Sequence, residues 1–160
     1  MNSTSSNMDN DTGQIWSLLN QITDPEIPVI SIRELGILQD IRVEKNTVVV
    51  VITPTYSGCP AMREIRQDIT KLLADEGYKN VLVETQLAPA WTTDWITPEG
   101  AKKLHDYGIA PPQPRSEGKI FCPLCGSNNT QLISEFGSTA CKALYKCTSC
   151  LEPFDYFKCI

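Results

Sequence analysis

The spacing of hydrophobic residues changes several times along this chain, and each change predicts a new structural element. Apolar residues recur at helical spacing over 15–22, which predicts a short amphipathic helix that ends before Pro25. Residues 38–44 alternate partly between apolar and polar, and residues 47–53 form an almost unbroken β-branched run. Because only Lys45-Asn46 separates these two segments, they are predicted to pair as a hairpin.

The β-branched run is apolar on both faces, which is typical of a central strand. A helix is predicted from Pro60 to about Glu76, with Gly77 as its C-cap. Residues 81–87 then alternate as a third strand, and the order strand, helix, strand predicts a parallel pairing. The inner face of the helix is predicted to consist of Met62, Ile65, Ile69, Leu72 and Leu73.

Two shorter elements complete this part of the chain. Ser31 and Glu34 have the spacing of a capping box, and Gly36 would close a single helical turn. A last helix is expected to begin at Thr97 and to stop at Gly108. The predicted fold is therefore α/β (α+β), with a small mixed sheet of three to four strands and flanking helices, followed by a C-terminal β-rich ribbon.

A proline-rich stretch predicts the domain boundary. Residues 110–118 include three prolines in nine residues, which indicates an extended, semi-rigid linker. The ribbon after it has two β-like segments, 131–136 and 154–159. The predicted order is a disordered lead-in (1–12), an α/β domain (13–109), the linker (110–118) and the ribbon (119–160).

Composition and charge narrow the class of protein. The chain has 160 residues, 41% of them hydrophobic, and a formal net charge of -5, so electrostatic binding to nucleic acid is disfavoured. We find neither an apolar run of the roughly 18 residues that a membrane span needs nor a basic start followed by an apolar signal stretch. We expect a soluble cytoplasmic protein whose cysteines stay reduced.

Two cysteine couples are the strongest chemical signal. Cys122 and Cys125 form one C-x-x-C pair, Cys147 and Cys150 form another, and 21 residues lie between the pairs. Two such turns on a folded-back chain place four thiolates around one tetrahedral ion, which predicts a structural Zn²⁺ site. Because 42 residues are too few for a self-sufficient core, the metal would supply folding energy.

Alternatives to this ligand set remain open. Iron could occupy the same four-sulfur cage, since geometry alone does not separate it from zinc. Cys141 could replace one ligand, because it lies six residues before Cys147. Otherwise Cys141 and Cys159 are additional thiols that pack as small apolar residues.

A seventh cysteine lies in a different setting. Cys59 is predicted to lie between the end of the central strand and the N-terminus of a helix, where backbone N–H groups point into a ligand-binding crevice. This position predicts a lowered thiol pKa, with Gly58 allowing a tight turn. The other interpretation, a buried apolar cysteine, is about equally favoured by position alone.

Asp24 and Glu26 lie two residues apart in a segment stiffened by Pro25 and Pro28. Their carboxylates could offer oxygen ligands to iron or form a docking edge for a partner. Acidic pairs of this kind more often cap or solvate a turn. His105 is expected to be an exposed surface histidine.

Several long motifs resemble a known family. They are Asp24-Pro-Glu-Ile-Pro-Val-Ile-Ser-Ile-Arg-Glu-Leu-Gly, Thr53-Pro-Thr-Tyr-Ser-Gly-Cys-Pro-Ala, Ala88-Pro-Ala-Trp-Thr-Thr-Asp-Trp-Ile, and the C-terminal segments 138–147 and 152–159. Over about residues 15–160 the chain resembles the PaaD family of bacterial phenylacetate catabolism. Its N-terminal part is similar to the wider family of small iron–sulfur assembly domains that includes SufT. The signature acidic segment of that family corresponds to Asp24 and Glu26, and its signature cysteine to Cys59.

The resemblance implies a non-catalytic accessory of the phenylacetyl-CoA epoxidase system. That system combines a di-iron oxygenase with a reductase that carries a flavin and a [2Fe–2S] centre, and both need iron. The chain is therefore expected to assist delivery of iron or an iron–sulfur cluster to one of these partners. Cys59, aided by Asp24 and Glu26, would hold the transient species, and the ribbon would dock the recipient.

Three rival interpretations stay open. The chain could be a thiol-dependent oxidoreductase in which Cys59 exchanges with Cys141 or Cys159, although Cys59 lacks a C-x-x-C motif. It could instead be a structural subunit of the oxygenase with no metal in transit. A nucleic-acid-binding ribbon is the weakest option, because no basic stripe accompanies its aromatic residues. The chain could also form a homodimer.

Overall fold

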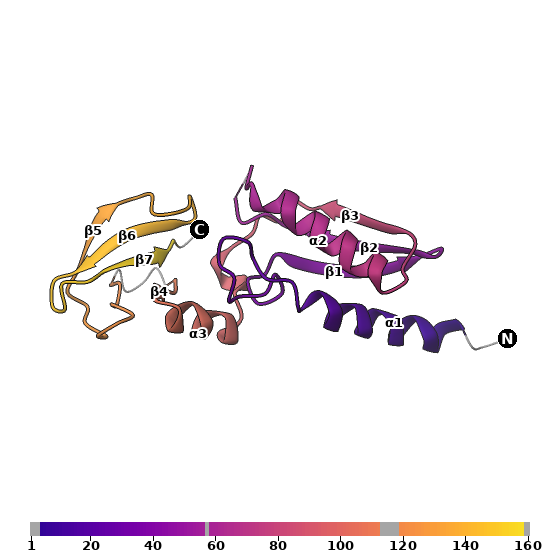
Figure 1. Cartoon of the computed structure of the whole chain (residues 1–160), viewed down its shortest axis with the longest axis horizontal. Helices are drawn as coiled ribbons and strands as arrows, with labels where there is room; N and C mark the ends of the chain where they lie inside the picture. The colour runs from indigo at the N-terminus through magenta and orange to yellow at the C-terminus, as the bar shows by residue number, and fades with distance from the viewer. Residues whose placement is uncertain (1–3, 57, 113–118, 159–160) are drawn as a thin grey trace. The chain divides into compact units, whose positions relative to one another are not determined.

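The chain folds into two compact units, residues 1–91 and 92–160 (Figure 1). The structure is a computed structural model, and it describes residues 4–56, 58–112 and 119–158. Both units mix helices and strands, which confirms the predicted α+β class.

The first unit contains the predicted three-stranded mixed sheet. Its strands are β1 (Leu38–Glu44), β2 (Thr47–Ile52) and β3 (Val81–Thr85), and β2 lies in the centre. β1 pairs antiparallel with β2, and β3 pairs parallel with it, as the order of elements predicted. Lys45 and Asn46 form the hairpin turn at positive φ angles of 47° and 66°, which match the twist of the flanking strands.

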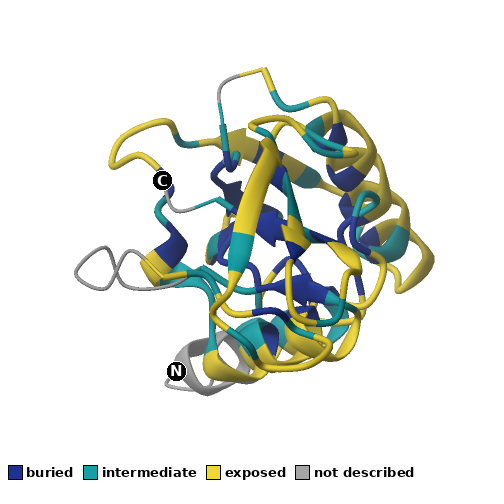
Figure 2. Ribbon diagram, turned by 90° about the vertical axis from the view of Figure 1, so that its left-hand side faces the viewer, coloured by how far each residue is buried: buried dark blue, intermediate teal, exposed yellow. Residues whose placement is uncertain are grey.

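The core of this unit lies between the sheet and the helices α1 (Thr4–Leu19) and α2 (Ala61–Asp75). In Figure 2 the buried residues of the strands and helices are dark blue and the exposed helix faces are yellow. Of the predicted inner face of α2, Met62 and Leu72 are only half-buried. The fully buried stripe, spaced by four residues, is Ala61, Ile65, Ile69 and Leu73.

Helix α1 begins earlier than predicted. It starts at Thr4, whereas residues 1–12 were expected to be a disordered lead-in, of which residues 1–3 lie outside the described chain. The apolar stripe of α1 begins only at Ile15, so periodicity could not locate the upstream turns. Once a helix is nucleated by packing, each added turn costs little, and polar residues can extend it.

The predicted capping box forms in the segment between α1 and β1. Ser31 Oγ accepts a hydrogen bond from the Glu34 N–H, and the Glu34 carboxylate accepts one from the Ser31 N–H, each 3.0 Å long. Gly36 follows at a φ of 82°. This turn leads directly into β1 and connects to the sheet, since the Thr53 N–H donates to the Ile37 carbonyl at 2.8 Å.

The second unit begins with the short helix η1 (Thr93–Trp95) and α3 (Pro98–Asp106), which Thr97 caps as predicted. Its sheet has the order β4-β7-β6-β5. The strands are β4 (Ile109–Ala110), β5 (Thr130–Ser134), β6 (Lys142–Cys147) and β7 (Pro153–Phe157). β5 and β7 were predicted, but β6 was missed because its lysines and alanine are weak strand formers.

The boundary between the units differs from the predicted linker at 110–118. Ile109 and Ala110 pair in parallel with Asp155 and Tyr156 of β7, and α3 contacts β4, so these elements belong with the ribbon. The division falls after Trp91. Residues 113–118 of the predicted linker lie outside the described chain. A strand of two residues is too short to show an alternation of apolar and polar side chains, so the sequence alone could not predict it.

None of the helices in residues 4–56, 58–112 and 119–158 is long and apolar enough to cross a bilayer.

Candidate metal centre and thiol site

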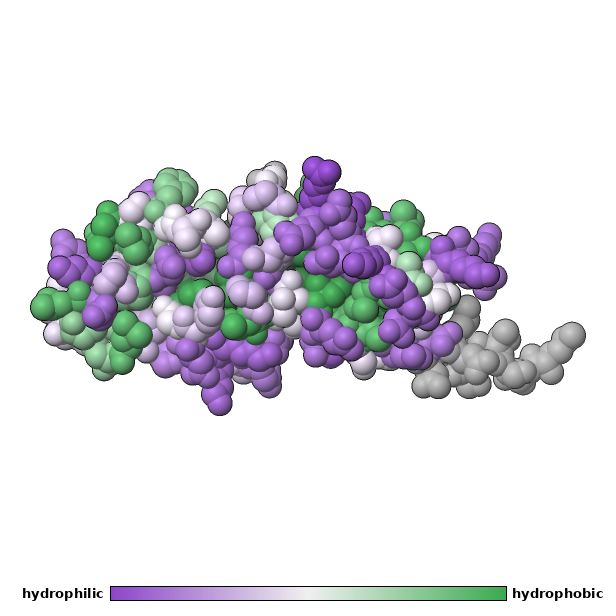
Figure 3. Space-filling model, in the orientation of Figure 1, coloured by the Kyte–Doolittle hydropathy of each residue, from purple (hydrophilic) through white to green (hydrophobic). Residues whose placement is uncertain are grey.

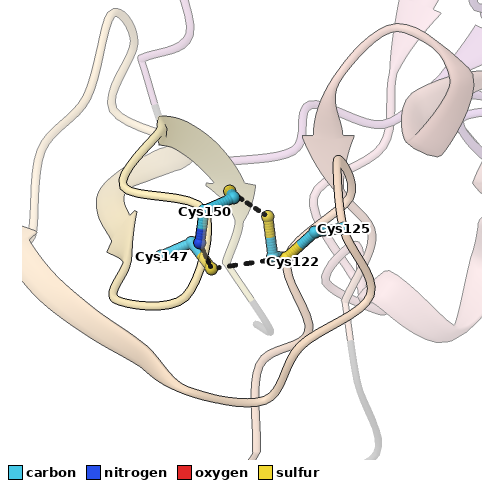
Figure 4. Close-up of side chains that lie close together, drawn as sticks. All are labelled: Cys122, Cys125, Cys147 and Cys150. Atoms are coloured by element: carbon cyan, nitrogen blue, oxygen red, sulfur yellow. Dashed lines mark hydrogen bonds between the residues drawn. The ribbon is translucent and has the colours of Figure 1, made fainter.

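The four cysteines of the two couples converge on one point of the ribbon (Figure 4). Cys122 and Cys125 flank a turn that Gly126 completes at a φ of 76°. Cys147 ends β6, and Cys150 lies in the turn that Leu151 completes at a φ of 68°. A left-handed residue after each couple turns the backbone back, so that both sulfurs of the couple point into the same space.

The sulfur geometry fits a tetrahedral ion. All four sulfur atoms lie within 4.8 Å of one another. The Cys122 and Cys150 sulfurs are 3.8 Å apart, and those of Cys125 and Cys147 are 3.5 Å apart. A zinc ion with four sulfurs at about 2.3 Å requires sulfur–sulfur distances of about 3.8 Å in a regular tetrahedron. The four residues therefore have the right donor type, number and spacing for zinc.

Backbone N–H groups stabilise the thiolate form of one of these cysteines. The N–H of Cys150 donates to the Cys147 sulfur at 3.4 Å, and this bond together with that of Ser149 lowers the pKa of Cys147 to about 6. At Cys150 the Glu152 N–H also favours the thiolate, but burial and the neighbouring thiols outweigh it and raise the pKa to about 12. A divalent ion bound among these sulfurs would favour the thiolate form of its ligands.

The metal centre is also part of the ribbon core. Cys122 and Cys147 are buried, and they belong to the apolar cluster of this unit. Tyr145 stacks on Phe154 beside it, with ring centroids 5.9 Å apart. An ion held by four thiolates has no open coordination position and acts as a structural crosslink. The buried members of the cluster are Ala110, Cys122, Ala143, Cys147, Phe154 and Tyr156.

The two remaining ribbon cysteines lie elsewhere. Cys141 is buried outside the four-sulfur cluster, and its sulfur lies 3.0 Å from the Thr139 hydroxyl. This placement agrees with the interpretation of Cys141 as a small packed residue rather than a substitute ligand. Cys159 lies outside the described residues.

Cys59 lies where the sequence predicted, two residues before α2 and beyond the carboxyl end of β2. Its N–H donates to the Tyr56 carbonyl at 3.3 Å, and the Met62 N–H donates to the Cys59 carbonyl at 3.2 Å. These bonds fold the loop back onto the start of the helix. Gly58 adopts a φ of 78°, as the predicted tight turn requires. The thiol is half-buried.

The predicted lowering of the Cys59 pKa is wrong. Burial raises the pKa of this thiol, and the nearby carboxylate of Glu26 adds to the rise. Hydrogen bonds from the Ala61 N–H and from the Tyr56 and Thr55 side chains act in the opposite direction but do not outweigh burial. Sequence position indicated the helix N-terminus, but it gave no measure of how much water the loop excludes.

Asp24 and Glu26 have different settings. Asp24 is only 5% exposed, and its Oδ1 accepts hydrogen bonds from the N–H groups of Glu26 and Ile27 at 2.8 and 3.0 Å. It therefore holds the turn, as the alternative interpretation of the acidic pair expected. Glu26 is half-buried and close enough to act electrostatically on Cys59. Glu26 is thus the member of the acidic pair whose charge is shown to act on the thiol.

Three loops meet at this end of the sheet. The parallel pairing of β2 and β3 places their carboxyl ends at one edge, where residues 53–60 and 86–91 follow. The Trp91 indole N–H donates to the Leu35 carbonyl at 3.0 Å and ties the second loop to the segment after the acidic pair. Within the described residues, the Thr53 hydroxyl is buried here without a hydrogen-bond partner.

Tyr56 is the residue of this site that the sequence analysis did not single out. Tyr56 lies three residues before Cys59, and the Cys59 N–H donates to the Tyr56 carbonyl. Burial dominates the pKa of the thiol, and the Tyr56 side chain acts in the opposite direction and lowers it. Ser57 lies outside the described residues.

Comparison with known proteins now identifies the family. The chain is 51% identical over 152 residues to a protein of Escherichia coli that is named as a putative subunit of 1,2-phenylacetyl-CoA epoxidase, and the match covers 92% of each chain. The model of the PaaD zinc beta ribbon domain matches residues 110–158. The chain belongs to the PaaD family. The resemblance seen in the sequence motifs is thereby confirmed, and the matched ribbon region contains the four-cysteine cluster.

The first unit of this PaaD-family chain has wider relatives. The family model of iron–sulfur cluster assembly proteins matches residues 12–84. "Fe-S protein maturation auxiliary factor YitW" of Bacillus subtilis is 33% identical over 82 residues, which cover 50% of this chain and 79% of that protein. A solved structure of a DUF59 domain from Bacillus anthracis aligns with a TM-score of 0.59 at 22% identity, covering 63% of this chain and 97% of that one. The last likeness shows the fold alone.

Proposed function

We propose that this chain is a non-catalytic maturation factor that assists delivery of iron or an iron–sulfur cluster to a phenylacetyl-CoA epoxidase. Cys59 would bind the transient species, with Glu26 beside it and Asp24 holding the turn that presents Glu26. A thiolate suits this task because it binds iron–sulfur units and still exchanges with other thiolates. The recipient would be the oxygenase or its [2Fe–2S] reductase.

The observation that carries the proposal is the setting of Cys59 within its own unit, which differs from the settings of the cysteines described in the ribbon. Four ribbon cysteines form one closed cluster and Cys141 is buried, whereas Cys59 remains partly exposed beside a carboxylate. Its raised pKa makes it a poor thiol–disulfide catalyst at neutral pH, since the attacking species is the thiolate. A metal ion would displace the proton, so a raised pKa is compatible with reversible metal binding.

The proposal is tested by co-expressing Cys59→Ser with the epoxidase components and measuring iron and acid-labile sulfide in each purified component. We expect lower iron occupancy in at least one component, with the variant chain still folded and loaded with zinc. Cys141→Ser is the matched control, since it removes a thiol buried in the ribbon. Full iron occupancy of both components beside Cys59→Ser would reject the delivery role.

For the ribbon we propose zinc as the resident ion. The basis is the four-sulfur donor set with tetrahedral spacing, which matches structural zinc sites. Elemental analysis of protein purified without oxygen should give one zinc per chain. An iron content of one per chain with visible thiolate-to-iron absorption would contradict this assignment.

A second candidate function is that of a stable subunit of the oxygenase. Two observations favour it: the Escherichia coli relative is named as an epoxidase subunit, and the ribbon exposes large apolar side chains (Figure 3). Examples are Leu124, Leu132, Ile133, Phe136 and Leu151. Stoichiometric co-purification through gel filtration would support this function, and its absence at micromolar concentration would favour transient contact.

A further inference from the structure

The strand β3 leaves one of its long sides open. The sheet of the first unit has the order β1-β2-β3, so β3 is an edge strand, and among the described strands only β2 pairs with it (Figure 1). The carbonyl of Asn80 and the N–H of Gln86 both bond to β2. Because the backbone groups of successive residues point to opposite sides of a strand, those of Val81, Val83 and Thr85 point outward, away from β2.

An arginine of α2 already contacts this outer edge. The Arg66 guanidinium donates hydrogen bonds to the Val83 carbonyl at 3.0 Å and to the Thr85 hydroxyl. Proteins commonly shield an exposed strand edge with a charged side chain, and Arg66 shields β3 in this way. Because Arg66 is itself exposed, an acidic group can replace the neutral carbonyl as its partner and form a stronger, charge-assisted hydrogen bond.

The charge beside the edge is positive. Arg63 lies one helical turn before Arg66 on α2, and both side chains are exposed. Neither arginine forms an ion pair with a carboxylate of the described residues, whereas Arg42 pairs with Glu44 and with Glu84 at 3.6 and 3.1 Å. The chain has a formal net charge of -5, so these two arginines form a local exception that suits an acidic ligand.

The two faces of β3 differ in character. The Thr85 side chain, which Arg66 contacts, lies on the face toward α2. Leu82 lies on the opposite face beside Val49 of β2, and its side chain is 48% exposed. Glu84 shares the face of Leu82, but its charge is paired with that of Arg42. A strand added to this edge therefore meets arginine on one face and an apolar side chain on the other.

We propose that the outer edge of β3 binds an extended peptide segment of a partner protein in which acidic and apolar side chains alternate. The segment adds a strand to the sheet: its backbone pairs with the outward-pointing residues of β3, its acidic side chains reach Arg66, and its apolar side chains pack on Leu82. Main-chain hydrogen bonds supply the affinity, and the alternate side chains supply the specificity. The inference goes beyond the proposed function, because it does not depend on a cargo at Cys59.

The experiment uses a short blocked peptide that alternates glutamate and valine. The peptide carries a fluorescent label, and its anisotropy is followed as the zinc-loaded full chain is added at low salt. We expect saturable binding that weakens as salt is added, because the arginine contacts are exposed. Two control peptides should not bind: one with lysine in place of glutamate, and one with methylated backbone amides, which cannot donate to a strand edge. Absence of saturable binding up to millimolar protein, or equal binding of either control peptide, would overturn the proposal.

Two variants of the chain test the charge and the backbone edge separately. Arg66→Gln removes the charge but keeps an amide that can donate to the Val83 carbonyl, and we expect it to weaken binding of the glutamate–valine peptide several-fold. Val81→Pro removes an outward N–H at the first residue of an edge strand, where proline is tolerated, and should also weaken binding several-fold. Arg33→Gln is the matched control, because the exposed Arg33 lies over the ring of Trp16 in α1, 5.3 Å from its centroid. Its affinity should equal that of the wild type.

Circular dichroism shows whether each variant folds, and if one fails to fold the other still tests the edge. Wild-type affinity in a folded Arg66→Gln or Val81→Pro variant would overturn the proposal, as would an equal loss of affinity in Arg33→Gln. Self-association of the wild-type chain that both variants abolish, without binding of the glutamate–valine peptide, would assign the edge to a second copy of the chain and overturn the proposal as well.

Discussion

Cys59 shows how opposing contacts set the chemistry of one side chain. Burial and Glu26 raise the pKa of the thiol, and the Ala61 N–H, Tyr56 and Thr55 lower it without reversing the rise. The thiol therefore stays largely protonated at neutral pH and ionises when a ligand replaces the proton. This state suits the role that we propose for Cys59, in which the thiol holds a soft metal species briefly and resists oxidation while it is empty.

At this scale we predict that Glu26→Gln lowers the pKa of Cys59. A carboxylate near a thiol disfavours the thiolate, so removal of its charge shifts ionisation to lower pH. The rate of Cys59 alkylation by iodoacetamide, followed by mass spectrometry of the tryptic peptide 46–63 in which Cys59 is the only cysteine, should consequently reach its midpoint at lower pH. Glu44→Gln serves as the control, because Glu44 pairs with Thr47 at the hairpin end of β2, away from Cys59.

A midpoint that stays in place in Glu26→Gln would show that water screens the carboxylate from the sulfur. In that case Glu26 would have no electrostatic role at the site, and burial would account for the raised pKa alone.

The two cysteine turns of the ribbon differ in the conformational cost of the residue that follows each couple. Both require a residue in the left-handed region after the second cysteine, and the first turn has Gly126 there while the second has Leu151. A branched side chain at positive φ costs about 1–2 kcal/mol relative to its ordinary conformation. Leu151 is 67% exposed, so its burial does little to offset this cost.

We therefore predict that Leu151→Gly stabilises the zinc-loaded ribbon by about 1 kcal/mol, the relieved strain less part of the chain entropy that glycine loses on folding. The urea concentration at which trypsin begins to cut after Lys142 reports on this unit, because Lys142 is buried in β6. Leu132→Gly is the comparison: it removes an exposed leucine from a strand, where φ is ordinary, and should destabilise the ribbon. If Leu151→Gly and Leu132→Gly changed the urea concentration for this cleavage equally, the result would argue against strain at Leu151.

The two units of the whole molecule rely on different sources of stability. In the first, long aliphatic side chains from α1, α2 and the sheet are fully buried, as Leu19, Ile52 and Ile69 illustrate. In the second, two of the six buried cluster residues belong to the four-cysteine set that could hold a metal ion. The ribbon core and the proposed ion would thus form one structure, whereas the first unit holds together by hydrophobic burial.

Removal of the metal should consequently unfold the ribbon and spare the first unit. After treatment with a strong zinc chelator, we expect trypsin to cut rapidly after Lys142 and peptides from α2 to stay protected. Cys122→Ser should reproduce this pattern without chelator, since it removes one ligand. Protection of Lys142 after verified loss of zinc would show that the ribbon core suffices alone.

The sequence by itself determined the local elements and the ligand set of this chain. The strand β2, the helix α2 and the Ser31–Glu34 capping box all form as predicted, because each depends on residues close in sequence. The spacing of the cysteine couples likewise determined which four sulfurs could share an ion. These features depend only on the secondary-structure preferences of the residues, the periodicity of apolar side chains and the number of cysteines that could bind one ion.

The tertiary structure alone decided the features that depend on distant neighbours. β6 forms between β5 and β7 despite weak propensity, and Ile109–Ala110 join the ribbon because they pair with β7. Asp24 became the support of a turn, and Cys59 became a thiol with a raised rather than lowered pKa. Burial and electrostatic contact depend on what the folded chain places around a residue, and no short segment of sequence contains that information.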